Sequence, residues 1–319
     1  MTIGEFELID RYFTRPARRV ALGIGDDCAL LAPRPGHQLA VSSDMLVEGR
    51  HFLSTVAPDR LGHKALAVNL SDLAACGARP LAFSLALALP RAEPDFLEGF
   101  ARGLLALADA HQCELVGGDT TRGPLTICIT VFGEVPDGAA LLRSGARAGD
   151  DLYVSGTLGD ARLALEAFRG HLSLEAADFE TARAAMERPE PRIGLGVALR
   201  GLATSAIDVS DGLLGDLGHI LRSSGVGAIV DVDAVPAGRA LAGQPPAGRR
   251  EYTLAGGDDY ELVFSAPGLA ADAVRHAATL SGVAVTRIGR IEAATGLRLV
   301  DARGETVADR FGSFDHFRT

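Results

Sequence analysis

The sequence predicts two α/β sandwich domains, and three observations lead to this prediction. The length of 319 residues suffices for one large domain or two ordinary ones. Strand-like apolar runs and helix-like amphipathic patterns occur together in both halves of the chain, as in layered α/β folds. Between the halves, the segment 136–151 is rich in Gly, Ala and Arg. We therefore expect one domain over 1–137 and a second over 148–319.

The elements of the first half follow from the spacing of apolar side chains. Acidic and apolar residues alternate over 5–13, which predicts a short helix. Two longer patterns predict helices at about 58–76 and 94–111, and both begin at a proline, which is favourable in a first helical turn. Apolar runs predict strands at 28–32, 38–43, 81–89, 113–116 and 125–135.

The second half shows the same mixture of patterns. Helices are expected at 159–168, 178–187, 192–201, 211–223 and 268–281. Strands are expected at 151–155, 204–208, 226–232, 260–265, 283–290 and 297–301. The segment 235–249 is rich in Pro, Gly and Ala and is expected to be a surface loop.

Composition excludes several classes of protein. A hydrophobic content of 47% and a mean hydropathy of +0.18 are enough for a folded core. The net charge of -10 argues against a general binder of nucleic acid or membrane surfaces, but it leaves phosphate ligands open, because bound divalent ions can reverse the local sign. The longest apolar run, 81–89, is far shorter than the ~20 residues of a membrane span. No signal segment opens the chain, so a cytoplasmic location is expected.

Lysine and cysteine usage narrows the chemistry further. Lys64 is the only lysine, and it stands in neither a P-loop nor a protein-kinase strand motif, so an ATP site must use other groups. The four cysteines contain no Cys-x-x-Cys pair, which favours reduced, mostly buried thiols over a zinc site or a disulfide framework.

Six acidic clusters beside Gly, Ser or Thr are the main functional signal. Small residues let the backbone approach a ligand, and carboxylates bind hard cations such as Mg²⁺. Several such clusters near the ends of apolar segments suggest one site for metal-dependent phosphate chemistry. The clusters lie at 25–27, 42–44, 71–72, 117–120, 208–212 and 256–259.

Asp72 gives the strongest physical argument among these acids. On a helix over 58–76 it shares one stripe with Leu61, Ala65, Val68 and Cys76, so it is expected to point inward. A buried carboxylate is costly without a partner. It is therefore expected either to bind a metal or to pair with an arginine, and the residues alone leave both open.

The acids of the second half have competing structural explanations. Ser210 is a plausible helix N-cap, and an acid at position 211 in the first turn would be favoured by the helix dipole alone. Asp208 lies before that cap, which makes a ligand role more plausible there. Asp258 and Asp259 could be hairpin-turn residues. Arg143 could be a phosphate clamp or a solvated side chain.

Taken together, these segments resemble the thiamine-monophosphate kinase family, whose superfamily includes aminoimidazole ribonucleotide synthetase and selenophosphate synthetase. The segments 45–52 and 69–75 are specific to the kinase, and the resemblance covers nearly the whole chain in order. The matching stretches are 25–29, 43–52, 64–75, 117–120, 143–146, 208–213, 259–262 and 315–317.

The resemblance implies a two-domain PurM-like α/β architecture. The N-terminal domain would be a mixed sheet with helices that binds ATP and Mg²⁺ and forms a barrel with its partner in the dimer. The C-terminal domain would be an α/β sandwich. It implies transfer of the ATP γ-phosphoryl group to thiamine monophosphate, within a homodimer. It assigns several Mg²⁺ ions to Asp27, Ser42, Ser43, Asp44, Asp72, Asp119, Asp208 and Asp211. It assigns ATP to Gly117, Gly118, Arg143 and Ser210, and thiamine monophosphate to His51, Asp258 and Phe314.

Three residues depart from the family pattern. Ser42-Ser43 stands where threonines are usual and keeps the hydroxyl groups. Asp258 replaces a glutamate and shortens the reach to substrate by one methylene. Phe314 replaces a Trp or Tyr, which keeps the stacking surface and loses the polar group.

No catalytic base is expected, because the acceptor phosphate has a second pKa near ~6 and is largely ionised at neutral pH.

Two other hypotheses about the function stay open beside the kinase. One is a superfamily synthetase with a different acceptor, although no reactive cysteine precedes Cys28 as in selenophosphate synthetase, and the chain does not end in a cysteine as hydrogenase-maturation relatives do. The other is a sensor that binds the same ligands without turnover.

Overall fold

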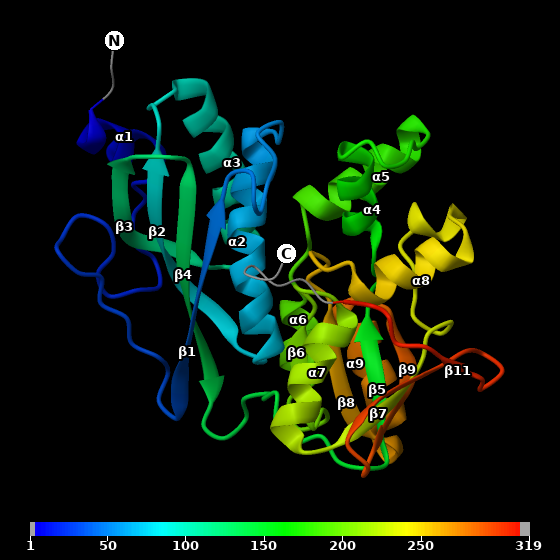
Figure 1. The fold of residues 1–319 in the computed structure, drawn as a ribbon. Helices are drawn as coiled ribbons and strands as arrows, with labels where there is room; N and C mark the ends of the chain where they lie inside the picture. Colours follow the sequence, from blue (N-terminus) through cyan, green and yellow to red (C-terminus); the bar gives the residue numbers. More distant parts are fainter. Residues whose placement is uncertain (1–3, 313–319) are drawn as a thin grey trace. The chain divides into compact units, whose positions relative to one another are not determined.

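The structure is a computed structural model and describes residues 4–312 (Figure 1). The chain forms two compact units. Unit 1 holds the residues up to Leu73 together with Ala78–Gly138, and unit 2 holds Ala74–Gly77 and the residues from Ala139 onward. Both units combine one sheet with several helices, as the sequence predicts.

Unit 1 contains a mixed four-stranded sheet in the order β1-β4-β2-β3. Strands β1 and β2 both pair antiparallel with β4, and β2 pairs parallel with β3. The strands are β1 (His37–Val47), β2 (Arg79–Leu89), β3 (Glu114–Arg122) and β4 (Thr126–Pro136). The four corresponding predictions are confirmed, although β1 and β3 continue further than their apolar runs suggested.

The predicted strand at 28–32 is wrong. Within the described residues, this stretch forms only an isolated bridge between Leu22 and Leu30. The Leu30 side chain is 56% exposed, and Pro33 and Pro35 follow it without a backbone N–H to donate. An apolar run without a partner strand therefore stays irregular.

Helices cover one face of the unit 1 sheet, as Figure 1 shows for α2 and α3. The helices of unit 1 are α1 (Glu5–Tyr12), α2 (Pro58–Ala75) and α3 (Pro94–Ala110). Both predicted proline starts are confirmed. Side chains of β1 alternate between the two faces: Leu46 is buried, whereas Leu39, Val41 and Met45 on the face away from α2 are 42%, 58% and 55% exposed.

Unit 2 contains a seven-stranded sheet in the order β11-β10-β7-β9-β5-β8-β6. Its central strand pairs, β5 with β8 and with β9, are antiparallel. A core of aliphatic side chains such as Leu152, Ile207 and Leu217 packs around the sheet. The strands are β5 (Asp150–Ser155), β6 (Ser205–Asp208), β7 (Gly227–Asp231), β8 (Leu262–Pro267), β9 (Val285–Glu292), β10 (Gly296–Val300) and β11 (Thr306–Val307).

All five helices predicted in unit 2 are present, and one predicted loop is partly helical. The expected loop at 235–249 is partly wrong, because the 3-10 helix η1 (Leu241–Gly243) and the start of α8 (Pro246–Ala255) lie in it. Pro246 occupies the first turn of α8, where proline is tolerated, and Leu254 is fully buried. The others are α4 (Asp160–Phe168), α5 (Ala176–Glu187), α6 (Ile193–Ala198), α7 (Leu213–Ser224), η2 (Gly268–Ala270) and α9 (Ala271–Ser281).

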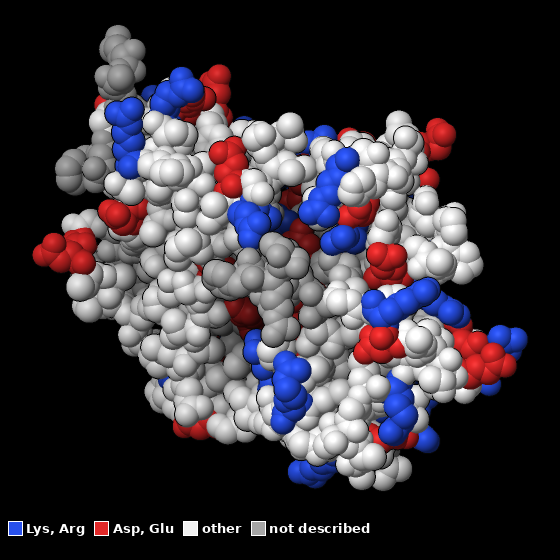
Figure 2. Space-filling view, viewed as in Figure 1, with Lys and Arg blue, Asp and Glu red and all other residues white. Residues whose placement is uncertain are grey.

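No helix in the described part of the chain is both long and apolar enough to span a bilayer. On the face that Figure 2 shows, the Lys and Arg side chains lie in several separate groups, some of which have Asp or Glu beside them. This distribution agrees with the net charge of -10.

Candidate functional site

The structure places the described site residues in two groups, one in each unit. In unit 1 they lie on β1, α2 and β3 and in the turns at 25–27 and 49–52. In unit 2 they lie in the segment 143–146 and in the connections β6–α7 and α8–β8. Phe314 lies outside the described residues.

Strand β1 and helix α2 bring Ser42 and Asp72 together. The Ser42 hydroxyl donates a short hydrogen bond to the Asp72 carboxylate. The backbone N–H of Asp44 donates to the Asn69 side chain at 3.0 Å, and Asn69 in turn donates to the Ala65 carbonyl at 3.0 Å. Asp72 is half-buried at the end of a stripe whose earlier members are fully buried, so its predicted inward direction is confirmed.

Ser43 is turned to the opposite face of the sheet. Its hydroxyl donates to the Ile129 carbonyl at 3.1 Å and lies 3.0 Å from the Thr130 hydroxyl. Strand alternation causes this separation, because successive side chains point to opposite faces. The two neighbouring serines therefore do not present their hydroxyl groups to one site.

Strand β3 carries the paired glycines and Asp119, which is exposed. Gly118 has φ 149, a conformation that favours glycine, and a Cβ there would lie 1.8 Å from the Leu85 carbonyl oxygen. Gly117 has open space around its missing Cβ. Gly118 is therefore required by the contact with β2, whereas Gly117 leaves room for a ligand to approach.

We expect Gly118→Ala to lower the stability of the protein by roughly 3 kcal/mol or more, because its methyl group would collide with the β2 backbone. Gly117→Ala is the matched control for folding and should leave the melting temperature within a few degrees. If Gly117 lies against ATP, this variant should still raise the KM for ATP. Thermal unfolding and steady-state kinetics of both variants check this, and equal melting temperatures would contradict the packing argument.

Two further site residues of unit 1, Asp27 and His51, differ in exposure. Asp27 is exposed in its turn, where its N–H donates to the Asp26 carboxylate at 2.9 Å. His51 is half-buried and accepts a hydrogen bond at Nδ1 from the Val47 N–H at 3.0 Å. Because Nδ1 accepts, we assign the proton of the neutral ring to Nε2, which makes Nε2 a donor.

In unit 2 the β6–α7 connection corrects the predicted helix cap. Helix α7 begins at Leu213 with Gly212 as its N-cap, so Ser210 is not the N-cap and Asp211 is not in the first turn. Gly212 has φ 111, which another residue would adopt only at a cost, and this fixes the start of the helix beyond it. The structural explanation for Asp211 is thereby removed. Asp208, at the end of β6, is 5% exposed.

Asp216 holds this connection and was missed from the sequence. Its Oδ2 accepts hydrogen bonds from the N–H groups of Ser210 and Asp211, both at 3.0 Å. Burial raises the pKa of Asp216 to about 7, and the charge of Asp211 adds to this, whereas the two N–H groups and Arg143 oppose it. The residue shares a helical stripe with Leu213, Leu217 and Ile220, a signal that could have identified it.

Arg143 is exposed on a segment that the end of α7 anchors. The Ser224 hydroxyl accepts from the N–H groups of Gly145 and Ala146 at 3.1 and 3.2 Å. Burial lowers the pKa of His219, and the positive charges of Arg222 and Arg143 lower it further. Arg143 therefore lies near enough to α7, the helix that follows Ser210 and Asp211, for its charge to act on His219.

The α8–β8 connection brings Asp258 beside Ser210. The Asp258 N–H donates to the Ser210 carbonyl at 2.8 Å, and the Tyr260 N–H donates to the Val209 carbonyl at 2.8 Å. The predicted hairpin turn at Asp258 and Asp259 is wrong, since this segment joins a helix to a strand. Asp258, which is implied for the substrate, and Ser210, which is implied for ATP, therefore lie on two hydrogen-bonded loops.

The two carboxylate oxygens of Asp259 differ in their hydrogen bonding. Its Oδ1 accepts from the Gly159 N–H at 2.9 Å, whereas its Oδ2 is shielded from solvent and accepts no hydrogen bond from the described residues. Burial, with the charges of Glu261, Asp258 and Asp160, raises the pKa of Asp259 well above its usual range.

This raised pKa gives a stability prediction for Asp259→Asn. An acid whose folded pKa exceeds its unfolded pKa stabilises the protein only at low pH, and that stability is lost as pH rises through the folded pKa. The asparagine variant escapes this loss. We therefore expect its melting temperature, relative to the wild type, to rise between pH 5 and pH 8. A difference that does not change with pH would contradict this account.

The residues implied for Mg²⁺ fit that ion in chemistry. All are carboxylates or hydroxyl-bearing residues, and oxygen ligands are those that Mg²⁺ prefers. Among residues 4–312, no three His, Cys, Asp or Glu side chains are grouped closely enough to hold a metal. The implied ligands are divided between the units, with Asp208 and Asp211 in unit 2 and the others in unit 1.

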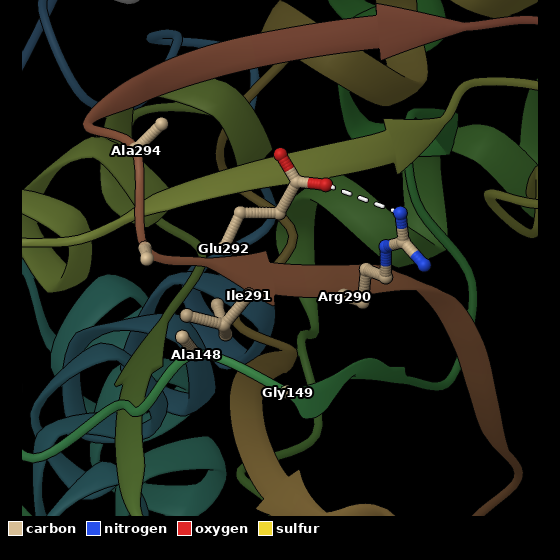
Figure 3. A pocket seen from close by; sticks show the side chains of 7 residues that line it. Ala148, Gly149, Arg290, Ile291, Glu292 and Ala294 are labelled. Carbon is tan, nitrogen blue, oxygen red and sulfur yellow. Dashed lines mark hydrogen bonds and ion pairs between the residues drawn. The ribbon is translucent and has the colours of Figure 1, made fainter.

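A shallow pocket of unit 2 contains none of these residues. It is lined by Ala148, Gly149 and the segment 290–294, and Arg290 and Glu292, neighbours on one face of β9, form an ion pair at 3.2 Å (Figure 3). Because none of the implied site residues lines this pocket, it is not the candidate site.

Comparison with known proteins identifies close relatives over the whole length. Residues 25–135 match the AIR synthase related protein, N-terminal domain, and residues 147–302 match the C-terminal domain of the same family. The thiamine-monophosphate kinase of Salmonella typhimurium is 46% identical over 100% of both chains. That of Haemophilus influenzae is 41% identical over 100% of this chain and 99% of its own.

Solved structures agree with these relatives. The thiamine-monophosphate kinase from Stenotrophomonas maltophilia K279a superposes with a TM-score of 0.87 at 47% identity, covering 96% of this chain and 99% of its own. AaThiL complexed with AMPPCP and TMP gives 0.77 at 30% identity, covering 99% and 97%. HypE of E. coli shares the fold at 23% identity, with a TM-score of 0.76 over 98% and 97%. The predicted two-domain PurM-like α/β architecture is confirmed.

Proposed function

Because the chain belongs to the thiamine-monophosphate kinase family, we propose that it transfers the γ-phosphoryl group of ATP to thiamine monophosphate in an in-line, Mg²⁺-dependent reaction that yields thiamine diphosphate and ADP. The observation that carries this proposal is the hydrogen bond of 2.8 Å between Asp258 and Ser210. It joins the loop implied for the substrate to the loop implied for ATP. The relative AaThiL, complexed with AMPPCP and TMP, supports the same pair of ligands.

The chemistry needs charge compensation more than a base. The acceptor phosphate is already ionised near neutral pH, since its second pKa is near ~6. Two unit charges ~4 Å apart repel by roughly 4 kcal/mol at an effective dielectric near 20. Bound Mg²⁺ would supply the positive charge that offsets this repulsion. In this proposal the ions are held by Asp27, Ser42, Ser43, Asp44, Asp72, Asp119, Asp208 and Asp211.

Each unit contributes a distinct part of ligand binding in this proposal. In unit 1, Gly117 leaves room for ATP, and Gly118, whose missing Cβ faces β2, contacts ATP through its backbone. Nε2 of His51 is a donor for the substrate. In unit 2, Arg143 and Ser210 contact ATP, and Asp258 contacts thiamine monophosphate together with Phe314. Ser43 takes part only through its main chain, because its hydroxyl is turned to the other face of the sheet. A cytoplasmic location, where ATP and Mg²⁺ are supplied, belongs to the same proposal.

An assay of turnover tests the proposed function. Purified protein with Mg-ATP is given thiamine monophosphate, thiamine, and a panel of other phosphate and amine acceptors, and ADP release is measured. We expect ADP release with thiamine monophosphate alone. Release with a different acceptor would favour another synthetase of the superfamily, and ligand binding without ADP release would favour a sensor.

We further propose that the protein is a homodimer formed through the open face of the unit 1 sheet. Exposed apolar side chains of β1 gather on this face, at Leu39, Val41 and Met45, and a two-fold axis would pair that face with itself.

Val41→Glu is expected to convert this dimer to a monomer, because each two-fold interface would then bury two like charges. Light scattering coupled to gel filtration measures the mass. Leu269→Glu, at a fully exposed residue of unit 2, is the control and should leave the mass unchanged. A Val41→Glu protein with wild-type mass would contradict the proposed interface.

A further inference from the structure

The loop that carries Asp258 has an unusual backbone. Asp258 and Tyr260 have φ values of 64 and 53, in the left-handed region that residues other than glycine rarely adopt. Aspartate tolerates this region better than tyrosine does, so Tyr260 is the more strained of the two. Such a conformation persists only where the surroundings hold it in place.

Backbone hydrogen bonds hold this loop against the β6–α7 connection. The N–H groups of Asp258 and Tyr260 donate to the carbonyls of Ser210 and Val209, and the Val209 N–H donates to the Glu261 carbonyl at 2.7 Å. The position of Asp258 therefore depends on where the chain is fixed at Glu261, the residue that directly follows the strained pair.

A buried ion pair fixes Glu261. Its side chain is 5% exposed, and Arg192, just before α6, donates to both of its carboxylate oxygens, with Nε at 2.7 Å. The Ser155 hydroxyl also donates to Glu261 and accepts from the Leu262 N–H at 2.8 Å. A Cβ on Gly156 would lie 1.9 Å from the Glu261 carboxylate, so this side chain lies directly on the backbone after β5.

The opposite loop has an anchor of its own. The N–H groups of Ser210 and Asp211 both donate to Asp216, a residue of α7 that has no part in the Arg192 pair. Loss of the pair should therefore displace the Asp258 side of the two loops more than the Ser210 side.

From these contacts we propose that Arg192 is a positioning residue, which acts through Glu261 to hold the backbone of 258–260 so that Asp258 meets the phosphorylated substrate. This inference rests on the proposed function. Arg192 does not itself contact the reacting groups. Its two-pronged geometry matters, because a guanidinium can donate to both carboxylate oxygens at once and an ammonium is a single point charge.

The test is the split between two KM values in Arg192→Met. We expect the KM for thiamine monophosphate to rise at least tenfold and the KM for ATP to change by less than threefold. Arg192→Lys, which keeps the charge and loses the two-pronged contact, should lie between the wild type and Arg192→Met. The lysine variant also keeps the test informative if the methionine variant fails to fold.

Arg183→Met is a matched control within the same unit. Arg183 pairs with Glu187 at 2.9 Å, and the exposed fractions of the two side chains are 23% and 4%, against 24% and 5% for Arg192 and Glu261. That pair lies on α5 and is expected to affect the melting temperature without changing either KM.

Three outcomes would overturn the inference while the wild type is active: an unchanged KM for thiamine monophosphate in both Arg192 variants, an equal rise in both KM values, or the same rise in Arg183→Met. A wild-type protein without turnover would instead overturn the proposed function. The two failures are therefore distinguishable in one set of assays.

Discussion

Asp72→Asn is expected to lower kcat by about a thousandfold, which corresponds to about 4 kcal/mol of lost transition-state stabilisation. Asparagine has the same shape and can still accept the hydrogen bond from Ser42, but it lacks the charge that would hold Mg²⁺. Because the side chain is half-buried and its contact is kept, the melting temperature should stay close to that of the wild type.

The control for this variant is Asp95→Asn, at an exposed acid in the first turn of α3 that has no part in the proposed site. It should keep full activity. The same experiment separates an enzyme from a sensor, since a sensor has no turnover to lose. Wild-type kcat in Asp72→Asn would contradict the proposed metal site.

Asp208→Asn should reduce kcat by a similar factor of about a thousand, because it removes a proposed ligand charge from unit 2. Asp208 is 5% exposed at the end of β6, directly before the loop that carries Ser210 and Asp211. Steady-state kinetics at several Mg²⁺ concentrations measure the loss of kcat.

Asp150→Asn provides a control of equal burial for Asp208→Asn. Asp150 is also 5% exposed, on β5 of the same sheet, and it accepts hydrogen bonds from the Arg147 N–H and the Thr204 hydroxyl at 2.9 and 2.7 Å. Its substitution should cost about 1–3 kcal/mol of stability with kcat retained. If Asp150→Asn lost as much turnover as Asp208→Asn, burial alone would explain both effects.

Most of the fold could be predicted because apolar periodicity reports burial directly. Both long helices of unit 1 begin at the predicted prolines, Pro58 and Pro94. The prediction failed where composition and burial diverge. The run at 28–32 is apolar without a partner strand, and the segment 235–249 looks like a loop although Leu241 packs into the core.

The candidate site could be predicted only in part, for a different reason. The direction of Asp72 follows from its position on a helix, and the opposite direction of Ser43 would have followed from strand alternation. The pair of Arg192 and Glu261 could not be predicted in this way, since 69 positions separate the two residues and no local pattern joins them. Residues that position a loop mostly act through such contacts between distant parts of the sequence, which no local pattern reveals.

The central claim is phosphoryl transfer from ATP to thiamine monophosphate. The most direct measurement is phosphorus NMR of one reaction mixture, which follows ATP, ADP, thiamine monophosphate and thiamine diphosphate together. With Mg²⁺ present we expect thiamine diphosphate and ADP to form in a one-to-one ratio, and neither to form after Mg²⁺ is removed by a chelator. Release of inorganic phosphate from ATP without thiamine diphosphate, or transfer that continues without a divalent ion, would contradict the account.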